Sequence, residues 1–220
     1  RTPVANVSSN IEAIIEGVLE PTNERLSSCY NELERITGII TELEKLRQIE
    51  GENMILHIGH VDIYELAKEV KLIFENEMSK KNIRCDIIGE HIDVCVDKDK
   101  MSQVLNNLIS NAVKYSKDGG SVRIYTLHGN GDIKKNSKDD SLQLVIEDTG
   151  IGINEEDIPR IMERGFTGYN GRLDRKSSGI GLYLCRKAAD RLGFVITFDA
   201  SYKNGTRVVI DMTQRYTKHE

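Results

Sequence analysis

The chain has 220 residues, of which 39% are hydrophobic and 30% charged, with a formal net charge of −5. This composition is typical of a globular protein, and the acidic balance argues against a nucleic-acid partner, because such proteins carry basic surfaces. No apolar run approaches the roughly 18–20 residues of a membrane-spanning helix, and the scattered cysteines, without a CxxC pair, favour reduced thiols in the cytoplasm over a zinc site.

The first 50 residues predict two packed helices. Apolar residues recur at three- and four-residue steps in each, and Pro21 separates the two runs. The first run contains Val4, Val7, Ile11, Ile14 and Val18, and the second contains Leu26, Tyr30, Leu33, Ile36, Ile40, Leu43 and Leu46. Two helices with such narrow seams bury little, whereas two hairpins would make a four-helix bundle. We therefore predict a homodimer through these helices; a hairpin docked on its own globular domain is the alternative.

Short strands and helices alternate after residue 54. Strands are predicted at 55–58, 83–88, 92–96, 121–128, 142–147, 194–198 and 206–212, and helices at 62–81, 97–116 and 182–192. Asp62 is the predicted N-cap of the first of these helices. The predicted fold class is α+β, with a helical hairpin over residues 1–51 and an α/β sandwich over residues 54–215. The sandwich has a mixed sheet with helices on one face.

A polar stripe follows one side of the predicted helix at 97–116. Gln103, Asn107, Asn111, Lys114 and Tyr115 recur at three- and four-residue steps, opposite an apolar face. Asn is a mediocre helix former, so two of them beside a lysine indicate a binding role. An amide oxygen can ligate Mg²⁺, and a lysine can bind phosphate. A solvated polar face is the alternative.

Glycine-rich segments follow two later elements. The strand at 142–147 leads into Asp148 and then Gly150 and Gly152, where the backbone can turn sharply and approach a ligand. Gly179 and Gly181 precede the helix at 182–192, whose N-terminus favours anions. A tight turn is the alternative for the first segment.

The segment at 160–176 predicts a mobile basic lid over phosphates, because it combines three glycines with five cations against two acids. Its cations are Arg160, Arg164, Arg172, Arg175 and Lys176. A surface loop without function is the alternative.

Taken in order, these segments resemble the ATP-binding domain of sensor histidine kinases, in the GHKL superfamily. "QVLNNLISNAVKYS" resembles the N box, "DTGIG" the G1 box, "GIGL" the G2 box and "GTRVVI" the closing strand. The resemblance covers about residues 55–213. The first 50 residues resemble the family's dimerisation and phosphotransfer hairpin, because "RTP" at 1–3 matches the end of its H box.

For the N box, the resemblance implies a set of phosphate and metal contacts. Asn107 is expected to ligate the Mg²⁺ that bridges the ATP phosphates, with Asn111 beside it. Lys114 is expected to reach a phosphate, and Tyr115 to flank the nucleotide. The lid departs from the commoner pattern of these kinases, so Arg164 and Arg172 both stay open as the phosphate-contacting cation.

For the other motifs, the resemblance implies that Asp148 accepts a hydrogen bond from the adenine amino group. Gly150 and Gly152 let the backbone close on the base, and Thr206 lies at the adenine end. The remaining ATP-binding residues open the helix that faces the phosphates, namely Gly179, Gly181 and Leu182.

Asn107 also favours a kinase over a hydrolase. The ATP-hydrolysing members that the sequence resembles, such as gyrase, MutL and the Hsp90 chaperones, carry Glu four residues before the asparagine that matches Asn111. That Glu activates water as a general base. The amide of Asn107 cannot accept a proton, which suits phosphoryl transfer to a protein acceptor better.

The predicted function is therefore that of the cytoplasmic catalytic portion of a two-component sensor histidine kinase. Mg²⁺-ATP would phosphorylate a His on the hairpin, and an Asp of a response regulator would then accept the phosphoryl group. The resemblance places that His three residues before Arg1, outside this chain, so we expect the chain to bind ATP without phosphorylating itself. Any membrane anchor would belong to an N-terminal sensor region outside the chain.

Thr2 matches the position from which the family's phosphatase activity orients water; a helix-surface hydroxyl is the alternative. For the whole protein, the alternatives are a GHKL-type ATPase and a non-catalytic nucleotide-sensing interaction module.

Overall fold

The computed structural model describes residues 2–50, 55–128, 141–168 and 178–213. The chain divides into two compact units, Arg1–Gly51 and Glu52–Glu220. Within the described ranges, no helix combines the length and the apolar character that crossing a membrane requires.

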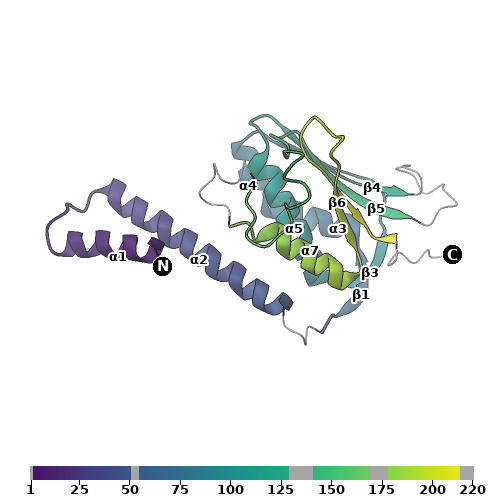
Figure 1. Ribbon diagram of the computed structural model, residues 1–220. Helices are drawn as coiled ribbons and strands as arrows, with labels where there is room; N and C mark the ends of the chain where they lie inside the picture. The colour runs from purple at the N-terminus through teal and green to yellow at the C-terminus, as the bar shows by residue number, and fades with distance from the viewer. Residues whose placement is uncertain (1, 51–54, 129–140, 169–177, 214–220) are drawn as a thin grey trace. The chain divides into compact units, whose positions relative to one another are not determined.

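The first unit is a pair of helices, as predicted. Helix α1 spans Thr2–Ile15 and α2 spans Asn23–Glu50, and the two pack against each other (Figure 1). Val7 and Cys29 are buried in the unit. Much of the predicted apolar seam, however, is exposed, at Val4, Ile11, Val18, Leu26, Tyr30, Leu33 and Ile40.

The second unit is an α+β sandwich, which confirms the predicted class. Its elements are β1 (Ile58–Asp62), α3 (Ile63–Ile73), α4 (Glu75–Lys80), β2 (Arg84–Ile88), β3 (Asp93–Asp97), α5 (Lys98–Tyr115), β4 (Ser121–His128), β5 (Leu142–Asp148), α7 (Gly181–Leu192), β6 (Val195–Phe198) and β7 (Arg207–Asp211). Helices α5 and α7 pack side by side on one face of the main sheet, and α3 packs against α5 (Figure 1).

The main sheet is mixed, with strand order β2-β4-β5-β7-β6. Strand β2 runs parallel to β4, and the other neighbours are antiparallel. Strand β7, the last in the sequence, therefore lies inside the sheet between β5 and β6. Strands β1 and β3 form a separate antiparallel pair.

Side chains alternate between the two faces of the main sheet, because successive residues of a strand point to opposite sides. Val122, Ile124, Ile146 and Ile210 are buried in the core between sheet and helices. The neighbouring odd-numbered residues lie on the other face, which we call the outer face. Adjacent residues of one strand can thus serve two different sites.

Two boundary predictions were wrong. The first strand lies at 58–62 and not at 55–58, because its pairing with β3 joins Ile58 to Asp97 and Asp62 to Asp93. The single helix predicted at 62–81 is broken at Phe74 into α3 and α4, which places Met78 in the core. The predicted cap is confirmed, since Asp62 accepts hydrogen bonds from the first turn of α3.

Candidate functional site

Helix α5 carries the predicted polar stripe. Asp97 caps its N-terminus by accepting the Lys100 N–H at 3.1 Å, and the apolar face is buried in the core. The residues that the N box assigns to ATP all come from this helix and are half-buried: Asn107, Asn111, Lys114 and Tyr115. The Lys114 ammonium lies 5.1 Å from the centre of the Tyr115 ring, within cation–π range.

Asn107 lies where α5 meets the start of α7. A Cβ placed on Gly181 would lie 3.7 Å from the Oδ1 of Asn107. The Nδ2 is buried and makes no hydrogen bond of ordinary geometry to the described residues. Burial raises the pKa of the Cys185 thiol to about 12, although the nearby Asn107 amide lowers it. The polar group beside the Asn107 amide is thus a sulfur atom, which is a weak acceptor. Most buried side-chain nitrogen atoms have a hydrogen-bond partner.

The C-terminus of α5 meets the loop that follows β5. The Ile151 N–H donates to the Tyr115 carbonyl at 3.2 Å. A Cβ on Gly150 would lie 2.4 Å from the same carbonyl oxygen, so only glycine fits at this approach. Gly150 therefore acts by letting the loop lie directly against the end of the N-box helix.

Asp148 is buried at the end of β5, on the helix side of the sheet. Its Oδ1 accepts the N–H groups of Gly150 at 2.8 Å and Thr206 at 3.1 Å. Burial raises the pKa of the carboxyl above its ordinary value, against the hydrogen bonds from Gly150 and Thr206 that lower it. Both backbone bonds end on Oδ1, so Oδ2 retains acceptor capacity for a ligand.

Gly205 is a site residue that the sequence reasoning missed. A Cβ there would lie 2.0 Å from the Asp148 carbonyl oxygen, and a Cβ on Gly152 would lie 3.2 Å from the Gly205 carbonyl. Gly152 also has a φ of +72°, which glycine adopts most easily. The "KNGT" turn was the available signal, but the turn alone does not reveal which strand it touches.

Glycines also allow a close backbone contact just before the start of α7. Gly165 N–H donates to the Gly179 carbonyl at 3.0 Å, and a Cβ on Gly179 would lie 2.7 Å from the Phe166 carbonyl oxygen. Gly181 is the first residue of α7, and Leu182 packs against the core. The first turn of a helix presents N–H groups that have no partner within the helix, and these attract anions.

The remaining predicted residues are placed less completely. Arg164 is exposed just before Gly165. Arg172 lies outside the described residues, as does all of the predicted lid after residue 168. Thr2 begins α1, and its side chain also lies outside what is described.

Lys81 is a second residue that the sequence did not single out. Its Nζ donates to the carbonyls of Val113 at 2.9 Å, Lys114 at 2.7 Å and Ser116 at 3.4 Å. Cations stabilise the C-terminus of a helix, where carbonyls lack partners within the helix. Lys81 thus fixes the end of α5, against which the loop after β5 rests. Its neighbour Asn82 has a φ of +52°, the only positive φ outside glycine among the described residues.

The structure is an α/β sandwich in which three elements converge on one side of the sheet: a polar helix, a strand that ends in Asp148 and is followed by Gly150, and a helix that begins at a glycine. The family model of histidine kinase-, DNA gyrase B- and HSP90-like ATPases matches residues 96–215, which include α5, the end of β5 and the start of α7. The chain belongs to this family.

Within the family, the chain is homologous to sensor histidine kinases. It is 28% identical over 211 residues to the sensor histidine kinase GraS of Staphylococcus haemolyticus, covering 96% of the chain and 57% of GraS. It is 26% identical over 226 residues to WalK of Bacillus subtilis, covering 96% of the chain and 34% of WalK. The chain thus spans about half the length of the first relative and about a third of the second.

Solved histidine kinases share the fold. The Acinetobacter baumannii kinase AdeS matches with a TM-score of 0.74 at 22% identity, over 99% of this chain and 97% of AdeS. ThkA in complex with the response regulator TrrA matches with a TM-score of 0.72 at 22% identity, over 98% and 58%. ShkA in complex with AMPPNP matches with a TM-score of 0.71 at 18% identity, over 100% and 44%.

Proposed function

We propose that this chain is the catalytic portion of a two-component sensor histidine kinase and binds Mg²⁺-ATP between α5, the end of β5 and the start of α7. The observation that carries the proposal is the convergence of Asp148 with Gly150 and Thr206 at one end, and of Asn107 with Gly181 at the other. The first end offers an acceptor for a base amino group, and the second offers an amide oxygen beside a helix N-terminus.

In this proposal, Asp148 selects adenine. Its Oδ1 is held by two backbone N–H groups, so the carboxylate has a fixed orientation before any ligand arrives. An acceptor oriented in this way favours a base that carries an exocyclic amino group over one that carries a carbonyl. Thr206 lies at the same end of the site, and Gly150 and Gly152 allow the backbone to approach the base.

Asn107 suits a magnesium site in which the substrate supplies the remaining ligands. Mg²⁺ takes oxygen ligands and is commonly held by one or two protein groups together with substrate phosphates and waters. No group of three or more His, Cys, Asp or Glu suited to a metal occurs among the residues that the structure describes, so phosphates would complete the set. When bound, the ion would neutralise charge on the phosphates. Asn111 and Lys114 lie further along the same helix. Of the two lid arginines expected to contact the phosphates, Arg164 is the one that the structure describes.

The reaction we propose is transfer of the γ-phosphoryl group to a histidine, and from there to an Asp of a response regulator. Phosphoryl transfer depends mainly on positioning and charge neutralisation. Asn107 cannot act as a general base toward water, which disfavours the alternative of a GHKL-type ATPase. The ThkA–TrrA complex and the sensor-kinase relatives support the response regulator as the partner class.

We also propose that the chain dimerises through α1 and α2. Leu26 and Leu33 are each about half exposed (48% and 47%) in the single chain. Burying such a seam against a second copy would form a four-helix bundle.

The proposal is tested first by ATP binding to this chain with and without Mg²⁺. Transfer is then tested in a longer chain that carries the residues upstream of Arg1, by following radiolabel from ATP to histidine and to a receiver domain. Steady phosphate release by this chain alone would instead favour an ATPase. ATP binding without any transfer in the longer chain would favour a nucleotide-sensing module.

A further inference from the structure

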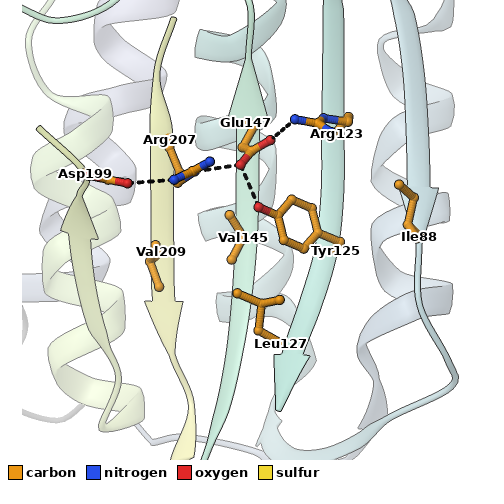
Figure 2. Close-up of a pocket in the computed structure, with 9 residues that line it drawn as sticks. All are labelled: Ile88, Arg123, Tyr125, Leu127, Val145, Glu147, Asp199, Arg207 and Val209. Carbon is orange, nitrogen blue, oxygen red and sulfur yellow. Dashed lines mark hydrogen bonds and ion pairs between the residues drawn. The ribbon is translucent and has the colours of Figure 1, made fainter. Parts of the chain in front are cut away.

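The outer face of the sheet carries a network of charged side chains, away from the helices. A hollow of about 510 Å³ lies over this face and is lined by residues from four strands and by Asp199. Figure 2 shows that its apolar part, which includes Leu127, Val145 and Val209, is separate from a charged part centred on Glu147. The mechanism proposed above uses none of these residues.

Glu147 is the centre of the network and only 2% exposed. It lies between β4 and β7, opposite Arg123 on one side and Arg207 on the other. Its carboxylate accepts hydrogen bonds from Arg123 Nη2 at 2.5 Å, Tyr125 Oη at 2.6 Å and Arg207 Nε at 2.6 Å. Burial alone would raise its pKa, but the bonds from Tyr125 and Arg207 and the two guanidinium charges hold it below the ordinary value. Glu147 is therefore a fixed anion.

Arg207 makes more of these contacts than its counterpart on β4. Besides Glu147, its Nη1 donates to Asp199 Oδ2 at 2.8 Å, and its guanidinium lies 4.3 Å from the centre of the Tyr202 ring. Asp199 and Tyr202 belong to the segment that joins β6 to β7. One arginine thus ties the first residue of β7 to both β5 and this connecting segment (Figure 2).

The residue before Arg207 is Thr206, which binds Asp148 on the other face. Thr206 and Asp148 are joined by two hydrogen bonds. The Thr206 N–H donates to the Asp148 side-chain carboxylate, and the Asp148 N–H donates to the Thr206 carbonyl at 2.9 Å. Glu147 and Asp148 are likewise neighbours. In each of the pairs Arg207–Thr206 and Glu147–Asp148, a residue of the outer face is therefore bonded directly to a residue at the adenine end of the proposed site.

We propose that Arg207 is a positioning residue for base selection: by holding β7 against Glu147 and Asp199, it fixes the Thr206 N–H that orients the Asp148 carboxylate. This inference rests on the proposed function, in which Asp148 accepts the adenine amino group. Arg207 lies on the outer face of the sheet, and in this proposal it acts through Thr206. A bidentate guanidinium is suited to the task, because it binds two carboxylates in a fixed plane.

The test compares Arg207→Gln with Arg123→Gln in the 220-residue chain. Both variants remove one arginine from Glu147, but only Arg207 is adjacent to Thr206. Calorimetry measures the affinity of each variant for ATP and for inosine triphosphate, whose base has a carbonyl in place of the amino group. The melting temperature of each variant is measured as well. We expect Arg207→Gln to lower the ATP-to-inosine-triphosphate affinity ratio roughly three- to tenfold. Arg123→Gln should leave the ratio within about twofold, whatever its melting temperature.

A double-mutant cycle supplies the second readout. If Arg207 acts through Asp148, adding Arg207→Gln to Asp148→Asn should cost little further selectivity, because the two losses are coupled. Should Arg207→Gln fail to fold, Arg207→Lys, which keeps the charge but not the two-carboxylate geometry, decides in its place. An unchanged ratio in the folded Arg207 variant, or an equal loss in Arg123→Gln, overturns the inference. A native chain that prefers neither nucleotide, or whose preference survives Asp148→Asn, would instead refute the proposed function.

Discussion

The Oδ1 of Asn107 lies beside Gly181, at a distance of 3.7 Å from where a Cβ on the glycine would be, which is ordinary van der Waals contact. Asn107 belongs to α5 and Gly181 begins α7, and these two helices pack against each other. The phosphate end of the proposed site therefore depends on two helices that are far apart in the sequence, and its amide is held where a helix N-terminus favours anions.

Replacing Asn107 should remove the Mg²⁺ dependence of ATP binding. In Asn107→Ala the amide oxygen is lost, so we expect ATP affinity in Mg²⁺ to fall at least about tenfold, to the level measured in EDTA. Isothermal calorimetry in both buffers checks this. Asn106→Ala is the matched control, because Asn106 donates to the Ser102 carbonyl within α5. Equal behaviour of the two variants would contradict the assignment of Asn107.

Replacing Asp148 should affect ATP without weakening the fold. The folded protein holds the Asp148 pKa above its ordinary value of 3.8, so the ionised carboxylate costs stability at neutral pH, and that cost is relieved as the pH falls through the raised pKa. Asp148→Asn keeps an oxygen for Gly150 and Thr206. We therefore expect about tenfold weaker ATP binding at pH 7, with no loss in the free energy of unfolding in urea.

The pH dependence of the same pair is a further check. As the pH falls toward the raised pKa, the native carboxylate becomes protonated and its advantage over Asn should shrink, starting at a higher pH than for an ordinary aspartate. A constant ratio of native to variant affinity at every pH would count against Asp148 as the acceptor.

Gly205 should tolerate no side chain. Gly205→Ala would place a Cβ 2.0 Å from the Asp148 carbonyl oxygen, so strand β7 must shift away from the loop. We expect a loss of about 1–3 kcal/mol in the free energy of unfolding, together with weaker ATP binding. Gly59→Ala is the control, since a Cβ there meets nothing within 4 Å. Near-native ATP affinity in Gly205→Ala would show that this contact does not shape the site.

Lys81 should stabilise the end of α5. Lys81→Met keeps an apolar stem but leaves the carbonyls of Val113 and Lys114 without their donor, which we expect to cost about 1–3 kcal/mol in urea unfolding. The neighbouring Lys80 is exposed, and Lys80→Met should stay within about 0.5 kcal/mol of the native protein. Similar values for the two variants would remove the role assigned to Lys81.

The hairpin seam should control the oligomeric state. We expect sedimentation to give a dimer for the native chain and a monomer for Leu33→Glu, because a charge would enter the proposed bundle. Asn31→Glu, at an exposed position on the opposite side of α2, should remain dimeric. A native monomer at micromolar concentration would contradict the dimer.

The predictable part of this molecule is local in sequence. Short spacings in the sequence predict Asp62 as a helix cap. They also predict the helix that carries Asn107 and the helix that begins near Gly181. The contacts of Lys81, Gly205 and Arg207 join segments far apart in the chain, and no short pattern specifies such partners. The misplaced first strand has the same cause, because its register is set by β3 rather than by its own alternation. Sequence thus located the likeness to a kinase site but not the residues that support it.

The central position of β7 also has a consequence for synthesis. Residues 207–211 are among the last of the described chain to leave the ribosome, yet they pair with both β5 and β6. Until they emerge, Asp148 lacks the N–H of Thr206, and β6 has no neighbour in the sheet. A nascent chain should therefore acquire nucleotide affinity abruptly, in one late step after almost the whole domain has been translated.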